Sequence, residues 1–267
     1  MPVESVAIAT GGVLLGYQAL RRFVFGLAQL AGAWQAWELV RDLFDAAAQG
    51  ESRQPDPTPA VVPSDKVMDV REVSYAYPGR DRNALLECSL QIRAGDRLLL
   101  EGGSGGGKST LGAILAGLRR PSSGLLLAGG IDRATLGVQG WRRRVATAPQ
   151  YHENHVLAAP LEFNLLMGRS WPPSPEDIRE AWAVCGELGL GLLLERMPAG
   201  LSEMVGDTGW QLSQGEKSRV YLARAILQEA PLVILDESFA ALDPDTLDQC
   251  LQCVLRRAPS LLVIAHP

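Results

Sequence analysis

Short runs rich in apolar, strand-forming residues recur along most of the chain and alternate with longer stretches of helical periodicity. The runs are Val67–Tyr75, Arg97–Leu100, Leu232–Leu235 and Leu261–Ala265. The last two, LVIL and LLVIA, are unbroken apolar runs, which is typical of parallel strands that are buried on both faces. Residues from about 160 to 228 have a mostly helical pattern. We therefore expect an α/β core with a helical subdomain inserted between two of its strands.

The first 48 residues contain two uncharged apolar stretches, 5–20 and 23–37, with Arg21 and Arg22 between them. A helix needs roughly 20 apolar residues to cross a bilayer, a length that the two stretches exceed only together. We expect residues 1–48 to form a transmembrane helix with a cytoplasmic extension, whose arginines face the inner interface or a polar cavity. A cleaved signal peptide would have basic residues before the apolar run, where this chain has Glu4. An isolated core or surface helix is a further alternative.

Residues 49–65 separate this region from the α/β part, 66–267. They hold four prolines among polar residues, which is typical of an extended linker. The 267 residues, of which 47% are hydrophobic, suffice for one large domain with an appendage. The net charge of −5 argues against binding of nucleic acid through phosphate neutralisation. Four scattered cysteines favour a reducing compartment over a disulfide framework.

A glycine-rich turn follows the second predicted strand. Residues 102–110 read GGSGGGKST, in which Gly102, Gly107, Lys108 and Ser109 match the pattern G-x-x-x-x-G-K-[ST]. Glycines let backbone N–H groups close around phosphate oxygens, and the following helix adds its positive end. We expect Lys108 to reach the β- and γ-phosphates of a nucleotide and the Ser109 hydroxyl to bind Mg²⁺. The other predicted nucleotide contacts in the loop are Gly103, Ser104, Gly105, Gly106 and Thr110.

The apolar run at 232–237 ends in two carboxylates, Asp236 and Glu237. They come at the carboxyl end of a predicted strand, where ligands bind in open α/β sheets. We expect Asp236 to hold Mg²⁺, directly or through water, and Glu237 to accept a proton from the water that attacks the γ-phosphate. Adjacent carboxylates at a strand end are common, so this prediction depends on the phosphate loop upstream.

Residues 212–216 read Leu-Ser-Gln-Gly-Glu and precede the acidic strand. With these residues the chain resembles the ATP-binding cassette (ABC) family, specifically the nucleotide-binding domain of an exporter-type ABC transporter. The family signature is usually LSGGQ, from which Gln214 and Glu216 depart while Ser213 and Gly215 are retained. The resemblance implies that Ser213 and Gly215, at the start of a helix, face the γ-phosphate bound to the opposite subunit. Two domains would then enclose two ATP molecules.

Other elements of the family follow in the same order. The resemblance implies that Tyr77 stacks on adenine and that Gln150 senses Mg²⁺ and the attacking water, in a loop that contacts the membrane domain. It implies that His266 contacts the γ-phosphate and that Asp243 contributes to the nucleotide site shared with the partner. The segment Val205–Gly209 resembles the exporter segment before the signature, with Asp207 where glutamate is usual.

The resemblance spans residues 66–267, and residues 1–48 resemble the last transmembrane helix of such an exporter. An exporter half normally has six transmembrane helices, of which only one fits here. The chain also ends one residue after His266, where the family continues with further strands and helices. Both departures predict a fragment or a truncated product, whose activity requires its own test.

The function implied by the resemblance is ATP hydrolysis, with ATP and Mg²⁺, coupled to export across a membrane. The partners would be a second ABC subunit, identical or different, and a transmembrane domain, with the nucleotide-binding domain on the cytoplasmic side of the inner membrane. One alternative is a soluble ABC ATPase that is not fused to a transporter. Another is a truncated, inactive cassette that acts only as an interaction module.

Two further patterns resemble metal sites. Cys250 and Cys253 have CxxC spacing, but no second pair accompanies them and they fall on a predicted helix. His152 and His155 follow Gln150 in a loop that the resemblance assigns to contacts with the membrane domain. Neither pattern is predicted to bind a metal.

Overall fold

The computed structural model describes residues 15–27, 29–30, 33–34, 36–38, 41, 65–79, 82–150 and 154–265. His152 and His266, the predicted contact to the γ-phosphate, lie outside these residues, as does nearly all of the predicted linker at 49–65. Contacts between residues divide the chain into two units, Met1–Gln54 and Pro55–Pro267.

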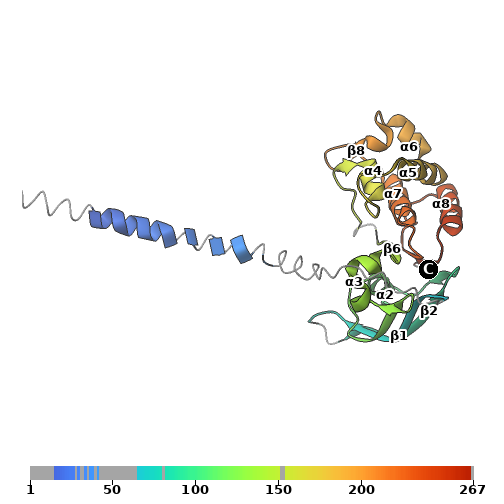
Figure 1. Ribbon diagram of the computed structural model, residues 1–267, viewed down its shortest axis with the longest axis horizontal. Helices are drawn as coiled ribbons and strands as arrows, with labels where there is room; N and C mark the ends of the chain where they lie inside the picture. Colours follow the sequence, from blue (N-terminus) through green and yellow to red (C-terminus); the bar gives the residue numbers. More distant parts are fainter. Residues whose placement is uncertain are drawn as a thin grey trace, which may run out of the picture. The chain divides into compact units, whose positions relative to one another are not determined.

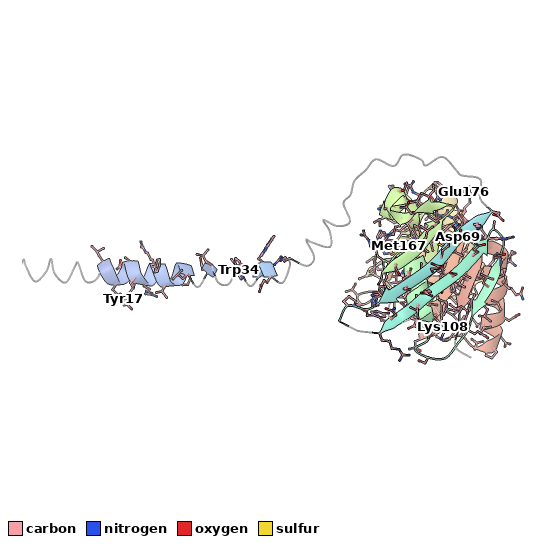
Figure 2. The ribbon with its side chains drawn as sticks, turned by 90° about the horizontal axis from the view of Figure 1, so that it is seen from below. Tyr17, Trp34, Asp69, Lys108, Met167 and Glu176 are labelled. Carbon is pink, nitrogen blue, oxygen red and sulfur yellow. The ribbon has the colours of Figure 1, made fainter. Side chains whose placement is uncertain are left out.

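In the first unit, residues 15–27 are helical, and the side chains of Tyr17 and Trp34 project outward (Figure 2). Leu20, Phe23 and Phe25 are exposed as well. Across the described residues, no helix combines the length and the apolar character that crossing a membrane requires. The transmembrane helix expected within residues 1–48 therefore stays a prediction.

A parallel sheet forms the centre of the second unit. Its strands are β3 (Arg97–Leu100), β10 (Leu261–Ile264), β9 (Leu232–Asp236) and β6 (Val145–Ala148), hydrogen-bonded in that order. All five residues of β9 are buried, as expected for an apolar run in the middle of a parallel sheet. These strands confirm the α/β class predicted from the apolar runs.

The first predicted strand belongs to a separate antiparallel sheet. Strand β1 (Lys66–Ala76) pairs with β2 (Asn83–Arg93) on one side and with β4 (Ser123–Ala128) on the other, and β4 pairs with β5 (Ile131–Asp132). The buried face of this sheet packs with helix α2 (Lys108–Leu115), and Met68, Ile92 and Ile114 belong to their common core. The helix that follows the phosphate loop therefore packs against a small antiparallel sheet of its own.

Helices α4 (Leu161–Leu166), α5 (Pro175–Glu187), α6 (Gly191–Arg196) and α7 (Gln214–Leu227) come between β6 and β9 in the chain. Figure 1 shows them grouped together, away from β1 and β2, and Figure 2 likewise separates Glu176 from Lys108. The group also contains the short strands β7 (Ala159–Pro160) and β8 (Met204–Val205) and a 3₁₀ turn at Gly200–Ser202. The remaining helices are α3 (Arg133–Arg142) and α8 (Pro244–Arg257).

Arg169 joins three parts of this helical group. Its guanidinium donates hydrogen bonds to Asp177 at 2.6 Å, to Glu180 at 2.7 Å and to Glu229 at 2.9 Å. Asp177 also closes the capping box of α5 with Ser174, which begins the helix. The arginine side chain is only 14% exposed, so these bonds are partly shielded from water. They hold the end of α4 against α5 and α7.

A second ion-pair cluster connects α5 to α8. Arg257 donates from Nε to Glu187 at 2.9 Å and also pairs with it through Nη2, and Arg256 binds the same carboxylate. The hydrogen bonds from Arg257 lower the pKa of Glu187 from 4.5 to about 2. A carboxyl whose pKa falls on folding stabilises the fold above its unfolded pKa, and this contribution disappears as the pH falls toward the folded value.

We therefore predict that the free energy of unfolding falls between about pH 4.5 and pH 2. This fall should be smaller in the variant Glu187→Gln, which has no carboxyl to protonate at this position. Because the cluster is partly exposed, the substitution should cost about 1 kcal/mol at neutral pH. Urea unfolding of both proteins across this pH range measures the difference. Glu195→Gln, at an exposed position of α6, is the matched control. Equal pH dependence in the unchanged protein and Glu187→Gln would contradict the prediction.

Candidate functional site

The predicted chemical groups converge because the strands of the central sheet run parallel. The phosphate loop follows β3, Gln150 comes two residues after β6, and Asp236 ends β9 with Glu237 directly after it. The carboxyl ends of parallel strands lie at one edge of their sheet. Residues from three separate parts of the sequence therefore meet at that edge, whereas His266 lies outside the described residues.

The phosphate loop has a backbone that requires glycine. Gly105 and Gly107 have φ angles of 77° and 82°, in the left-handed region that side chains with a Cβ rarely adopt. A Cβ at Gly107 would also lie 2.6 Å from the carbonyl oxygen of Ala84, well inside van der Waals contact. Gly107 is the residue before α2, so the loop ends at the N-terminus of this helix, as predicted. The free N–H groups and the positive end of the helix there suit a phosphate.

Lys108 lies folded across the loop. Its Nζ donates hydrogen bonds to the carbonyl oxygens of Gly102 at 2.7 Å and Gly103 at 3.0 Å, and the residue is only 8% exposed. A buried ammonium held by neutral carbonyls can exchange them for phosphate oxygens, which carry a full negative charge. The Lys108 ammonium, which is predicted to bind phosphate, therefore already lies at the phosphate loop.

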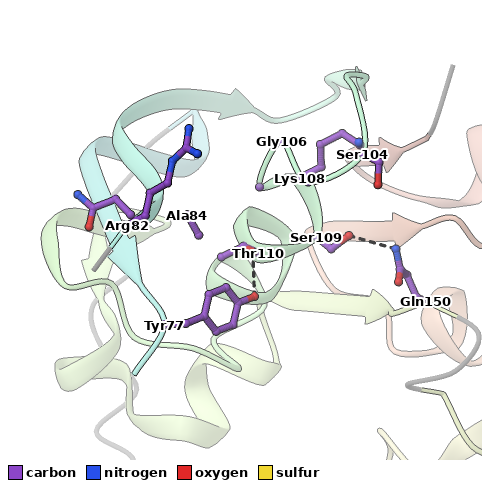
Figure 3. Close-up of a pocket in the computed structure, with 12 residues that line it drawn as sticks. Tyr77, Arg82, Ala84, Ser104, Gly106, Lys108, Ser109, Thr110 and Gln150 are labelled. Atoms are coloured by element: carbon purple, nitrogen blue, oxygen red, sulfur yellow. Dashed lines mark hydrogen bonds between the residues drawn. The ribbon is translucent and has the colours of Figure 1, made fainter. Parts of the chain in front are cut away.

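Gln150 joins the phosphate loop to the acidic strand. Its Nε2 donates to the Glu237 Oε1 at 2.7 Å and to the Ser109 Oγ at 3.2 Å. Ser109 lies in α2, whereas Gln150 follows β6 and Glu237 follows β9, and the two hydrogen bonds join all three side chains. Figure 3 shows the bond between Gln150 and Ser109. The Glu237 carboxylate is thereby connected to the second residue of the helix that follows the phosphate loop. This bridging amide is the observation that unites the two halves of the predicted site.

The oxygen donors of Ser109 and Asp236 fit Mg²⁺. Ser109 has a hydroxyl oxygen and Asp236, a buried residue, has a carboxylate, and both are the hard oxygen donors that Mg²⁺ prefers. Few protein ligands are required, because water and substrate phosphates complete the coordination of Mg²⁺ in such sites. Gln150 currently presents its amide nitrogen to Ser109, so it would serve as a ligand only if its oxygen faced the metal.

Glu237 occupies a strained backbone position. Its φ angle is 51°, which costs a residue with a side chain roughly 1–3 kcal/mol. The strand neighbour holds it there, because Glu237 N donates to the Ile264 carbonyl at 3.0 Å. The following residue, Ser238, is buried and donates from Oγ to the Ala148 carbonyl at 3.2 Å. These two bonds fix the carboxylate relative to β10 and to the Gln150 loop.

Tyr77 lies next to the helix of the phosphate loop. Its hydroxyl shares a hydrogen bond of 3.0 Å with the Thr110 hydroxyl, as Figure 3 shows. Tyr77 and Thr110 line one cavity of about 700 Å³ together with most of the phosphate loop and Gln150. Arg82, Asn83 and Ala84 line it as well and were not predicted. No sequence pattern marks them, because their place depends on how β2 approaches the loop.

Comparison with known proteins agrees with this geometry. Residues 85–240, which contain the phosphate loop and the acidic strand, match the sequence family described as "ABC transporter". The chain belongs to the ABC transporter family. The match confirms the resemblance to exporter-type ABC proteins that the motifs indicated.

Curated ABC relatives include proteins of different named cargo. The chain is 30% identical over 257 residues to the "ATP-dependent lipid A-core flippase" of Thiobacillus denitrificans, covering 95% of this chain and 43% of that protein. It is 32% identical over 269 residues to the "Glutathione/L-cysteine transport system ATP-binding/permease protein CydC" of Escherichia coli, covering 99% and 45%. The chain thus spans less than half the length of these relatives.

Among solved structures, the chain is similar to a bacterial Atm1-family ABC exporter with ATP bound. The TM-score is 0.66 with 28% identity, covering 75% of this chain and 34% of that chain. The fold of an ABC exporter is therefore matched over three quarters of the chain.

The ABC signature is the start of α7. Ser213 is the N-cap, and its hydroxyl accepts a hydrogen bond from Glu216 N at 3.2 Å while Glu216 Oε2 accepts one from Ser213 N at 2.8 Å. Arg196 binds the other oxygen of this carboxylate at 2.8 Å. Burial opposes ionisation of Glu216, but the bonds from Ser213 and the charge of Arg196 outweigh it and lower its pKa. The departure from the family glutamine thus completes a capping box, which the pattern S-x-x-E alone signals.

The signature does not line the cavity at the phosphate loop. It instead approaches the loop after β9, because a Cβ at Gly215 would lie 3.6 Å from the Ala241 carbonyl oxygen. Asp243, two residues further, is the N-cap of α8 and accepts a hydrogen bond from Thr246 N at 3.1 Å, which lowers its pKa. Within one ABC chain, Ser213, Gly215 and Asp243 therefore form a group separate from Lys108 and Tyr77.

Cys250 and Cys253 lie buried on α8. Burial raises the pKa of the Cys250 thiol to about 11 and that of Cys253 to about 12, so both thiols stay protonated at neutral pH. A thiol that stays protonated is a poor metal ligand. In the part of the chain that the structure describes, which includes His155, no three His, Cys, Asp or Glu side chains are grouped to hold a metal.

Proposed function

We propose that this chain hydrolyses ATP for an exporter-type ABC transporter. The Gln150 amide carries the proposal, because it connects Ser109 of the phosphate loop at 3.2 Å with Glu237 of the acidic strand at 2.7 Å. A phosphate-binding loop alone would support binding only, whereas a base fixed beside it supports hydrolysis. The ABC relatives share this region with the chain but are named for two kinds of cargo. The similarity therefore supports ATP hydrolysis and does not identify the class of cargo.

In the proposed mechanism, the phosphate loop and Lys108 bind and orient the β- and γ-phosphates, and Tyr77 stacks on adenine. Glu237 then accepts a proton from the attacking water. Gln150 positions this water beside Glu237, to which its amide already donates a hydrogen bond. Mg²⁺, held by Ser109 and Asp236, would neutralise charge on the phosphates. His266 would contact the γ-phosphate from the end of β10.

The site is completed by a second ABC subunit in this proposal. Ser213, Gly215 and Asp243 lie apart from the cavity at the phosphate loop, and the exposed N-terminus of α7 suits a phosphate from elsewhere. Two chains that face each other would each supply this group to the other's ATP. The prediction is that specific ATPase activity rises with protein concentration.

The membrane connection forms the last part of the proposal. We assign residues 1–48 to a transmembrane helix and its extension, 49–65 to a linker and 66–267 to the cytoplasmic ATPase domain at the inner membrane. Exposed Leu20, Phe23, Phe25 and Trp34 support contact with lipid or with other apolar helices. A second cavity, of about 470 Å³, has Asn154 and His155 from the loop after Gln150 on its wall, and it suits a contact with the membrane domain.

The decisive experiment measures phosphate release by the full chain with MgATP over a hundredfold range of protein concentration. Activity per chain that rises with concentration supports the two-subunit ATPase. ATP binding without hydrolysis at every concentration would instead favour the truncated, inactive cassette. Flotation of the full chain with lipid vesicles, compared with a variant that lacks residues 1–48, separates the exporter from a soluble ABC ATPase. Equal recovery of both with the vesicles would contradict the assignment of residues 1–48.

A further inference from the structure

A carboxylate lies at the start of the signature helix. Glu216 Oε2 accepts a hydrogen bond from Ser213 N at 2.8 Å, so its negative charge is held at the N-terminus of α7. Burial alone would raise the pKa of Glu216, but the hydrogen bonds from Ser213 and the charge of Arg196 lower it, and the group is ionised at neutral pH. The family glutamine could close the same capping box through its amide oxygen. The departure to glutamate therefore adds one negative charge.

This charge opposes the role proposed for the signature. Ser213 and Gly215 of one chain would receive the γ-phosphate of the ATP bound to the other chain, and Ser213 is exposed, as that role requires. The positive end of a helix attracts a phosphate, whereas a carboxylate in the same turn repels it. A signature with glutamate at position 216 therefore requires a cation that compensates for the added charge.

Arg196 supplies this cation from a different helix. It is the last residue of α6, twenty residues before Glu216, and its Nη2 donates to Glu216 Oε1 at 2.8 Å. The Glu216 side chain is 13% exposed and that of Arg196 is 61% exposed, so the carboxylate is shielded while the guanidinium reaches into solvent. The two carboxylate oxygens thus have separate partners, Ser213 within the helix start and Arg196 outside it.

We propose that Arg196 is a positioning residue of the signature, which holds Glu216 in the capping box and neutralises it so that the start of α7 can receive a phosphate. This inference rests on the proposed function, in which two subunits share each ATP site. Neither Arg196 nor Glu216 lines the cavity at the phosphate loop. Their effect should therefore appear when two chains assemble on ATP, and not when one chain binds ATP at its own loop.

The inference predicts that one substitution rescues another. Arg196→Gln leaves the carboxylate without its cation and should weaken assembly on ATP. Glu216→Gln removes the carboxylate charge and introduces the residue that is usual in the family, so Arg196 is not needed in that background. A pair that only stabilised the fold would behave differently, because loss of either partner would then weaken the protein.

The experiment measures two quantities for the full chain, both single variants and the double variant. The first is the dissociation constant of ATP at low protein concentration, and the second is the protein concentration at which ATPase activity per chain is half-maximal. Arg196→Gln should raise the second about three- to thirtyfold, because both shared sites lose a charge interaction at a helix end. It should leave the first unchanged, which also shows that the phosphate loop is folded.

Glu216→Gln and the double variant should not raise the half-maximal concentration. Arg179→Gln is the matched control, because Arg179 is an exposed arginine that pairs with Glu176 within α5, in the same helical group. This control should behave like the unchanged protein in both measurements.

The alternatives give different results. Equal increases in Arg196→Gln and Glu216→Gln would overturn the inference, because the pair would then only stabilise the fold. An increase in the double variant as large as in Arg196→Gln would overturn it as well, since Arg196 would then act on the phosphate directly. No increase in Arg196→Gln would do the same while the proposed function stands. Activity per chain of the unchanged protein that does not rise with concentration would instead overturn the two-subunit site of the proposed function, and the inference with it.

Discussion

Replacement of Glu237 by glutamine is expected to lower the rate of ATP hydrolysis by about 10²–10⁴-fold, the usual contribution of a general base, and to leave ATP binding intact. The amide has nearly the shape of the carboxylate but cannot accept a proton from water. Its oxygen can still accept the 2.7 Å hydrogen bond from Gln150 Nε2, so the connection to the phosphate loop is kept. The substitution therefore removes the chemistry and preserves the arrangement.

Two measurements on one protein test this prediction. The rate of phosphate release at saturating MgATP reports the chemical step, and the dissociation constant of ATP without turnover reports binding. Glu72→Gln is the matched control, because Glu72 also has a left-handed backbone, with a φ of 50°, but lies exposed on β1. Turnover of Glu237→Gln within about threefold of the unchanged protein would exclude Glu237 as the base.

The sequence was sufficient to predict the edge where the site forms. Three of the four apolar runs became neighbouring parallel strands, and parallel strands bring their carboxyl ends together by geometry alone. The phosphate loop at the end of β3 and the carboxylates at the end of β9 were therefore placed correctly relative to the sheet. A pattern such as G-x-x-x-x-G-K-S also constrains its own backbone, and Gly107 has the positive φ that the pattern requires.

The sequence could not predict contacts between distant segments. Nothing in the run Val67–Tyr75 indicates the direction of its pairing, and β1 pairs antiparallel with β2 and β4. Pairing direction depends on the connections and on which surface must be covered, and the composition of one strand contains neither. Arg119 illustrates the same limit, because nothing in its neighbourhood in the sequence indicates that it lies over Tyr77.

Local hydrogen bonds explain one of the two departures in the signature and not the other. Glu216 has a clear structural role, since it closes the capping box with Ser213 and binds Arg196. Gln214 is exposed at the first turn of α7, and nothing in the structure explains its departure. A glutamate at a helix N-terminus is favoured by the helix dipole, so this one stabilises the start of α7.

The second large effect is expected for Lys108→Ala, which should weaken ATP binding by about two to three orders of magnitude, as the loss of one or more charge-assisted hydrogen bonds does. Lys108 is 8% exposed, and its ammonium donates hydrogen bonds to the carbonyls of Gly102 and Gly103 in the loop. Alanine removes the positive charge that would face the β- and γ-phosphates. It also removes the side chain that holds the loop before the nucleotide arrives.

These two contributions can be separated with Lys108→Arg, which keeps the charge but not the length and shape of the side chain. If charge dominates, arginine should restore part of the affinity for ATP, and if the fit to the loop dominates, arginine should behave like alanine. Lys66→Ala is the matched control, because Lys66 pairs with Asp69 on β1, where Arg71 also binds the same carboxylate. Dissociation constants of ATP for the four proteins decide the matter. An affinity of Lys108→Ala equal to that of Lys66→Ala would mean that the loop binds phosphate through its backbone alone, and the role assigned to Lys108 would be wrong.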